Sequence, residues 1–178
     1  MSDFTSGRLL NDAALRRRRS SKHFRPIAMV VVPLIAILFQ VYVPRFFQYL
    51  GYLELPLLVT VYYALMNRRP IPGLFFGCVI GLVQDSLSHQ PLGMFGIVKT
   101  LVGYFAGSVS MRFDVDNPML QFVLGFFFFF FHQFFYWILS RALLGLQIDF
   151  DIQQTLILSL LNAVVALPLF VLLDKMRE

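Results

Sequence analysis

The sequence predicts an all-α fold: a polytopic membrane protein built as a bundle of about six transmembrane helices. Hydrophobic residues make up 58% of the 178 residues, and the mean hydropathy is +0.71. Soluble domains are typically about 45–50% apolar. The apolar residues also fall into blocks of roughly 20, which is the length that a helix needs to cross a bilayer. Basic residues gather at the ends of these blocks, as in membrane proteins.

Six apolar blocks follow a polar and basic segment. Residues 1–25 are expected to form a cytoplasmic tail and residues 26–178 a membrane domain. Helices are expected at about 27–43, 48–66, 72–87, 92–110, 118–140 and 153–173. Pro44 should end the first helix, and Pro56 marks a possible start for the regular part of the second. Because no small-residue cleavage site follows the first block, we expect a retained helix and not a signal peptide.

The distribution of Lys and Arg predicts the orientation. Twelve of the 15 fall on the side of the termini and two on the other side, with Lys99 inside a helix. The twelve include a basic cluster in the tail: Arg16, Arg17, Arg18, Arg19, Lys22 and Arg25. Cytoplasmic connections carry the excess of Lys and Arg, so both termini are expected in the cytoplasm. The tail residues are expected to set topology or to contact the membrane surface.

Several function classes are disfavoured. The sequence pI near 9.7 comes from the tail and the helix ends, so it indicates topology and not nucleic-acid binding. One cysteine, Cys78, excludes an intrachain disulfide. The sequence lacks a His-Glu-x-x-His motif, a Gly-x-Ser-x-Gly elbow and a P-loop. We therefore expect no enzyme activity, no cofactor and no metal.

Small residues define one face of each of two helices. In the helix at 72–87, Gly73, Gly77 and Gly81 are four residues apart and share a face with Asp85. The next helix carries a second small face, which contains Gly96, Thr100, Gly103 and Gly107. Glycines at this spacing let helices approach closely in a membrane. The two faces are expected to pack against each other or to bind partner helices.

Charged residues inside apolar helices are functional candidates, because burying a charge in the membrane is costly. The Lys99 side chain points back toward the level of Asp85, so the two residues can form an ion pair. The alternative is that the two charges act separately. Glu54 near the end of the second helix is expected to reach the interface, with a cavity as the alternative. His132 is expected to be a packing residue, because no second His or Cys stands at metal spacing.

The stretch from Gly77 to Gly93 resembles a motif of the rod shape-determining protein MreD family. It contains a Gly-rich helix ending in Gly-Leu-x-x-Asp (Gly81 to Asp85), a short turn, and then Pro-Leu-Gly. Gln40 at the end of the first helix, and Glu54 beside Pro56, also fit the family. The departures are a longer basic tail, Glu54 where Asp is more usual, and Lys99.

The resemblance implies a non-catalytic component of the bacterial cell-elongation complex in the inner membrane. Implied partners are an MreC-like bitopic membrane protein, an actin-like MreB filament, the glycan polymerase and transpeptidase of the complex, and membrane lipids. The family is also similar in shape to substrate-binding subunits of energy-coupling-factor transporters, which is the alternative function. That alternative requires a polar pocket, for which Glu54, Asp85, Lys99 and Asn162 are available.

Overall fold

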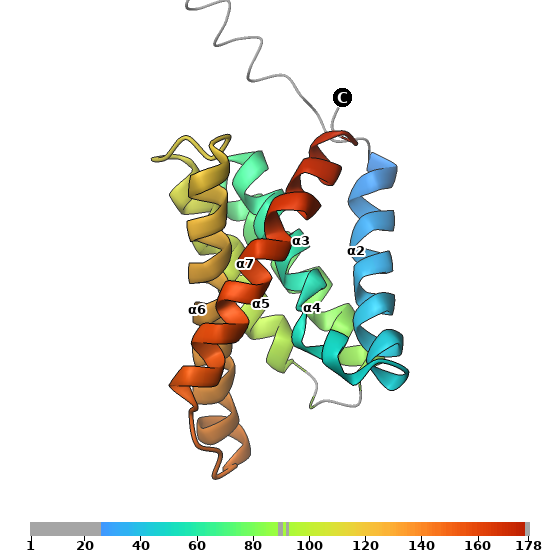
Figure 1. Cartoon of the computed structure of the whole chain (residues 1–178), viewed down its shortest axis with the longest axis vertical. Coiled ribbons are helices and arrows are strands. Elements are labelled where there is room, and N and C mark those ends of the chain that lie inside the picture. Colours follow the sequence, from blue (N-terminus) through green and yellow to red (C-terminus); the bar gives the residue numbers. More distant parts are fainter. Residues whose placement is uncertain (1–25, 89–90, 92, 177–178) are drawn as a thin grey trace, which may run out of the picture.

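The computed structural model describes residues 26–88, 91 and 93–176, and these residues form a helical bundle without strands (Figure 1). Its α-helices are α2 (Pro26–Tyr42), α3 (Leu55–Asn67), α4 (Pro70–Leu87), α5 (Met94–Ser110), α6 (Pro118–Leu144) and α7 (Ile152–Asp174). Two short 3₁₀ helices, η1 (Val43–Arg45) and η2 (Gln48–Tyr52), connect α2 to α3. The expected all-α fold is confirmed. The basic cluster at Arg16–Arg25 lies outside the described residues.

Local sequence explains where the helices begin and end. Asn117 accepts a hydrogen bond from the Met119 amide at 2.9 Å and so caps α6, which begins at Pro118. Gly145 adopts a left-handed conformation (φ 63°) and ends α6 four residues later than expected. Asp151 caps α7 by accepting from the Gln154 amide at 3.0 Å.

The second expected helix is divided in the structure. η2 covers its first part, the chain is extended at Leu53, and the α-helical part begins at Leu55 with Pro56 in its first turn. This proline marks the beginning of the regular helix because it has no N–H to leave unbonded there. The expected helix at 48–66 therefore corresponds to the span Gln48–Asn67, but its regular α-helical part begins only at Leu55, beside Pro56 as expected.

The short helix α3 lies at the centre of the bundle. Every residue from Pro56 to Met66 is buried, and α3 contacts α2, α4, α5, α6 and α7. At its end, the Tyr62 hydroxyl binds Asp174 at 2.7 Å and the Tyr63 hydroxyl donates to the Ala28 carbonyl at 2.9 Å. These bonds place the end of α3 beside the beginning of α2 and the end of α7. We call this end of the bundle the termini side.

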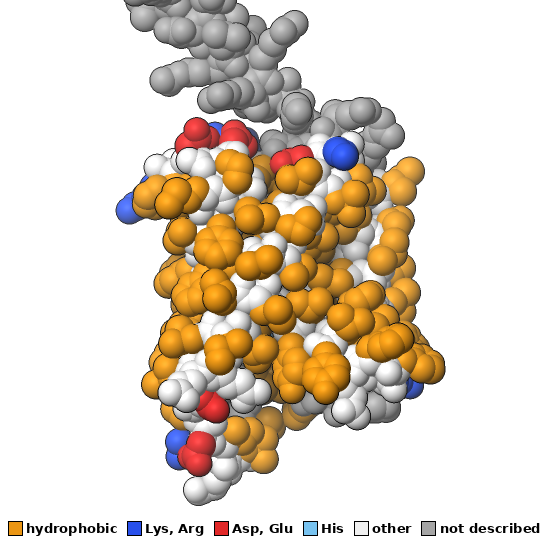
Figure 2. All heavy atoms as spheres, in the orientation of Figure 1, with side chains coloured by type: hydrophobic (Ala, Val, Ile, Leu, Met, Phe, Trp, Pro, Cys, Tyr) orange, Lys and Arg blue, Asp and Glu red, His pale blue; other side chains and the backbone are white. Residues whose placement is uncertain are grey.

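The face of the bundle seen in Figure 2 is largely apolar between its ends, and the charged side chains visible there lie at the two ends. Five helical segments are long and apolar enough to cross a membrane: Ile27–Arg45, Gln48–Asn67, Pro70–Leu87, Pro118–Leu144 and Ile152–Asp174. The apolar helix α5 is slightly shorter, with 17 residues. The fold is that of a multi-pass membrane protein.

Helices α4 and α5 pack with their backbones in contact. A Cβ atom added to Gly73 would overlap the Gly103 carbonyl, and one added to Gly77 would overlap the Lys99 carbonyl. Gly81 faces the carbonyl of Phe95 in the same way, and Gly107 faces the carbonyl of Arg69. The structure therefore brings the two small faces together along their whole length. They leave no room for a partner helix between α4 and α5.

Candidate functional site

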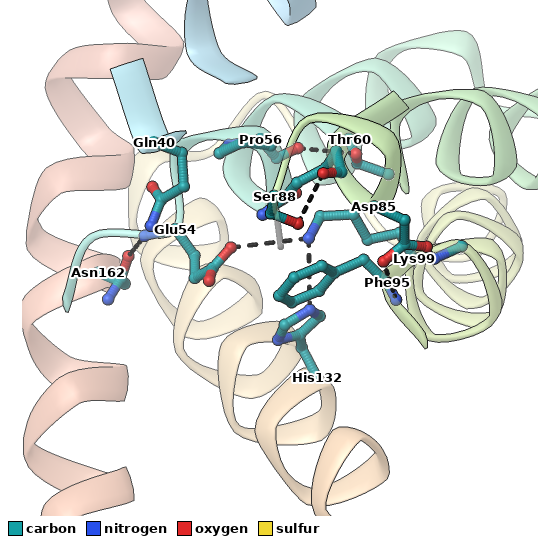
Figure 3. Close-up of polar contacts among 12 residues, drawn as sticks. Gln40, Glu54, Pro56, Thr60, Asp85, Ser88, Phe95, Lys99, His132 and Asn162 are labelled. Atoms are coloured by element: carbon teal, nitrogen blue, oxygen red, sulfur yellow. Dashed lines mark hydrogen bonds and ion pairs between the residues drawn. The ribbon is translucent and has the colours of Figure 1, made fainter. Parts of the chain in front are cut away.

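Polar side chains from five elements meet inside the bundle, toward the end opposite the termini side (Figure 3). They come from the break before α3 (Glu54), the last turn of α4 (Asp85), the second turn of α5 (Lys99), and the middle parts of α6 (His132) and α7 (Asn162). Asp85, Lys99, His132 and Asn162 are at most 1% exposed. We call these five residues the polar cluster. Buried polar groups at this depth require partners, because lipid offers none.

Asp85 binds the beginning of α5. One of its carboxylate oxygens accepts from the amides of Gly93 and Gly96 at 3.0 and 2.9 Å, and the other accepts from Phe95 at 3.1 Å. The first N–H groups of a helix have no acceptor within the helix, and a negative charge is favourable there. Gly93 makes the turn with φ 96°, a conformation that suits glycine. The motif residues Gly81, Asp85 and Gly93 thus join α4 to α5 as one unit.

Lys99 forms its ion pair with Glu54 and not with Asp85. Its ammonium lies 3.6 Å from Glu54 Oε2 and 4.4 Å from the centroid of the Phe95 ring. The alternative in which Lys99 pairs with Asp85 was wrong, because the short Asp85 side chain accepts hydrogen bonds from the backbone amides of α5. The long Lys99 side chain instead extends to the segment before α3. The Glu54 side chain is 13% exposed, so the expectation that it reaches the interface was also wrong.

His132 is the second polar neighbour of Lys99. The Lys99 ammonium lies 3.4 Å from His132 Nε2. An ammonium can only donate, so Nε2 accepts and the proton of the neutral ring is assigned to Nδ1. Nδ1 is buried without a hydrogen-bond partner, as are Gln40 Oε1, Glu54 Oε2 and Gln84 Oε1 among the described residues. The ring also stacks on Phe95 at 6.0 Å between centroids.

Asn162 satisfies the backbone where the chain breaks before α3. Its side-chain oxygen accepts from the Glu54 amide at 2.9 Å, and its amide group donates to the carbonyls of Tyr52 and Leu158 at 2.9 and 3.0 Å. Nearby, Gln40 donates to the Gly51 carbonyl at 3.3 Å. Irregular backbone at membrane depth requires such partners. This break holds Glu54 in reach of Lys99.

The cluster is suited to fixing helix positions, because it joins the start of α3 to α4, α5, α6 and α7 through one ion pair and several hydrogen bonds. Among the described residues, no three His, Cys, Asp or Glu side chains converge in a way that would hold a metal ion. Sequence reasoning found Glu54, Asp85 and Lys99 but missed Phe95 and the role of His132 beside Lys99. Phe95 and Lys99 are four residues apart on one helix, a spacing from which their contact was predictable.

Fold and site together define a class: a small polytopic membrane protein whose helices are held by a glycine contact and an internal polar cluster. The comparison with family models then identifies the family. The model for the rod shape-determining protein MreD matches residues 21–177, which is nearly the whole chain, and the chain belongs to this family. No curated protein and no solved structure gives a significant match.

Proposed function

We propose that this chain is a non-catalytic component of the cell-elongation complex, which positions the proteins that extend the bacterial wall. The family match over residues 21–177 carries the proposal. The described chain supports it, because almost every residue from Pro26 to Met176 belongs to a membrane helix or a short connection. The longest non-helical runs that the structure describes, residues 111–117 and 145–151, are too short for a soluble catalytic domain.

We place both termini in the cytoplasm of the cell, with the protein in the inner membrane. Arg68, Arg69, Arg112 and Lys175 support this orientation, because they lie on the termini side. Arg45 and Arg141 lie at the other end. Single cysteines at Gln147 and Asp114, introduced after Cys78→Ser, test it with an impermeant thiol reagent on intact cells. Labelling at Gln147 alone is expected, and labelling at Asp114 alone would reverse the orientation.

The partner surface in this proposal is the end of the α6–α7 hairpin. With 27 residues, α6 is about 40 Å long, which exceeds the roughly 30 Å hydrocarbon core. Figure 1 shows this hairpin extending past the other helices at the end away from the termini. Trp137 donates to the Ile148 carbonyl at 2.7 Å and packs on Phe150 at 5.3 Å, so the connection is ordered against α6. Four large apolar side chains are exposed here: Leu143, Leu144, Leu146 and Ile148.

An exposed apolar patch of this kind marks an interaction site. We assign it to the MreC-like bitopic partner, because a bitopic protein continues from the membrane into the periplasm. The MreB-like filament would lie on the opposite, cytoplasmic side. The polymerase and transpeptidase would be recruited through the same assembly. The glycine faces are not available to these partners, since α4 and α5 cover each other.

The transporter alternative has no support from the arrangement of its candidate pocket residues. Lys99 binds Glu54, Asp85 binds the amides of α5, and Asn162 binds the backbone around Glu54. These groups therefore satisfy one another in place of lining an open polar pocket.

Depletion in a rod-shaped host tests the function. Depleted cells should become round or lyse, and cells with Leu146→Ser should lose copurification of the bitopic partner. The matched control is Tyr49→Ser, since Tyr49 is an exposed apolar residue at the same end of the bundle but outside the hairpin. Normal width in depleted cells, with loss of uptake of one nutrient, would replace the scaffold by a transporter subunit. Equal partner recovery with both variants would remove the hairpin from the interface.

A further inference from the structure

Helices α2 and α4 enclose an apolar groove that the function described above does not use. The groove has a volume of about 700 Å³. Its lining side chains are all apolar and come from both helices, among them Leu34 and Ile37 of α2 and Ile71, Phe75, Val79 and Val83 of α4. We call it the α2–α4 groove. It exists because α2 packs more extensively on α3 than on α4.

The groove has a buried floor and exposed walls. Ile37 and Ile80 are 2% and 3% exposed and form the floor, while Phe75 and Val79 on the α4 wall are 63% and 59% exposed. A void between packed side chains forfeits dispersion contacts, so an apolar groove open to the membrane is stabilised by an apolar occupant.

The length of the groove matches one leaflet of a bilayer. Along α4 it runs from Ile71 to Val83, about 18 Å at 1.5 Å per residue. A full hydrocarbon core is roughly 30 Å thick, so one leaflet is about half of this. Ile71 is the second residue of α4, and the groove therefore begins at the termini side. A partner helix that crosses the membrane needs a surface through both leaflets, whereas a single lipid needs only one.

An exposed arginine precedes α4 at the end of the helix where the groove begins. Arg69 is exposed, precedes α4 directly, and lies two residues before the lining residue Ile71. Its neighbour Arg68 is paired with Asp116 at 3.1 Å and lies 3.9 Å from Asp114. Among the described residues, Arg69 has no such carboxylate partner, so it can meet the phosphate of a lipid headgroup. Helix α4 also begins here, and the start of a helix favours negative charge.

We propose that the α2–α4 groove binds an anionic phospholipid from the leaflet on the termini side. An acyl chain fills the groove between Ile71 and Val83, and the headgroup lies at Arg69. Phosphatidylglycerol is the appropriate probe, because it has an apolar tail and a net negative headgroup. The inference needs only the membrane location of the chain, and it stands or falls separately from the proposed elongation function.

Photo-crosslinking of the full chain in vesicles tests the proposal. The vesicles contain phosphatidylethanolamine and phosphatidylglycerol in equal amounts, and either lipid can carry a photoreactive group in its acyl chain. Phosphatidylglycerol should label Phe75, Val79 or Leu34 far above other lipid-facing residues. Val79→Trp fills the groove and should abolish this labelling. The matched control, Val164→Trp, changes the same residue type at similar exposure (55%) on α7 and should leave it intact.

The headgroup is tested at Arg69. Arg69→Gln should lower labelling by phosphatidylglycerol about fivefold and leave labelling by phosphatidylethanolamine unchanged. Arg69→Lys should retain the labelling by phosphatidylglycerol. Arg112→Gln, in the α5–α6 loop at the same end of the bundle, should leave that labelling unchanged. Equal labelling of Val79 and Val164 in the unaltered chain would overturn the site. Unchanged labelling by phosphatidylglycerol in the Arg69→Gln variant would overturn the preference for an anionic headgroup. In cells, capture of a partner helix or a second copy by a crosslinker at Val79 would show a protein interface in place of a lipid site.

Discussion

Helix α4 has two faces that meet their neighbours in opposite ways. Its glycine face touches the backbone of α5 from Gly73 to Gly81. Its other face, with Ile71, Phe75 and Val79, stands apart from α2 and lines an open groove. The face with the larger apolar side chains is therefore the one that packs less closely.

The difference shows what holds helices together in lipid. Apolar side chains gain little from leaving lipid tails, which are equally apolar, so the α2–α4 face has no strong drive to close. Glycines allow close backbone contact, and Asp85 adds three hydrogen bonds to the start of α5. Packing and polar contacts, and not hydrophobicity, decide which face is buried.

The comparison predicts its largest effect at Gly77. Gly77→Leu places a branched side chain against the Lys99 carbonyl, so α4 and α5 must separate. We expect a loss of about 4 kcal/mol or more, which prevents accumulation of folded protein. Monodispersity in mild detergent and thermal unfolding measure it. A Gly77→Leu protein as stable as the unaltered chain would show that the helix contact is dispensable.

The next effect is expected at the buried ion pair. Glu54→Gln or Lys99→Met alone should cost about 3–5 kcal/mol, because each leaves a buried charge without its partner. The double variant should lose less than the sum of the two. A double-mutant cycle of unfolding free energies measures this coupling. Strict additivity would mean that the two charges act separately despite their 3.6 Å separation.

Asp85→Asn should have an intermediate effect. The substitution removes the charge and one acceptor oxygen, which leaves at least one amide of α5 without a partner. The expected loss is about 2 kcal/mol in the unfolding free energy. Asp149→Asn is the control, since Asp149 is exposed in the α6–α7 connection and should change stability little. Equal behaviour of the two variants would contradict the role of Asp85 at the start of α5.

The smallest effect is expected on the groove face. Val79→Leu should change the unfolding free energy by less than about 0.5 kcal/mol, because the side chain meets lipid and not another helix. Thermal unfolding of the Val79→Leu and Gly77→Leu variants, measured in parallel, compares the two faces of α4. A large loss for Val79→Leu would show that the groove closes in the folded protein.

The sequence by itself determined the membrane class, the number of helices and most of their boundaries. Hydrophobic blocks, prolines such as Pro56 and caps such as Asn117 act within a few residues, so they are visible locally. The glycine spacing in α4 and α5 also predicted which faces are small. The resemblance around Asp85 and Gly93 led to the family that the family model identifies.

Only the tertiary structure decided how the charges pair. Lys99 meets Glu54, which is 45 residues earlier, and His132, which is 33 residues later. Whether a long side chain reaches α3, α4 or α6 depends on how the helices are rotated and spaced, and periodicity along one helix does not contain that information. The groove has the same origin. It lies between two apolar faces, and it exists because α2 packs more extensively on α3 than on α4.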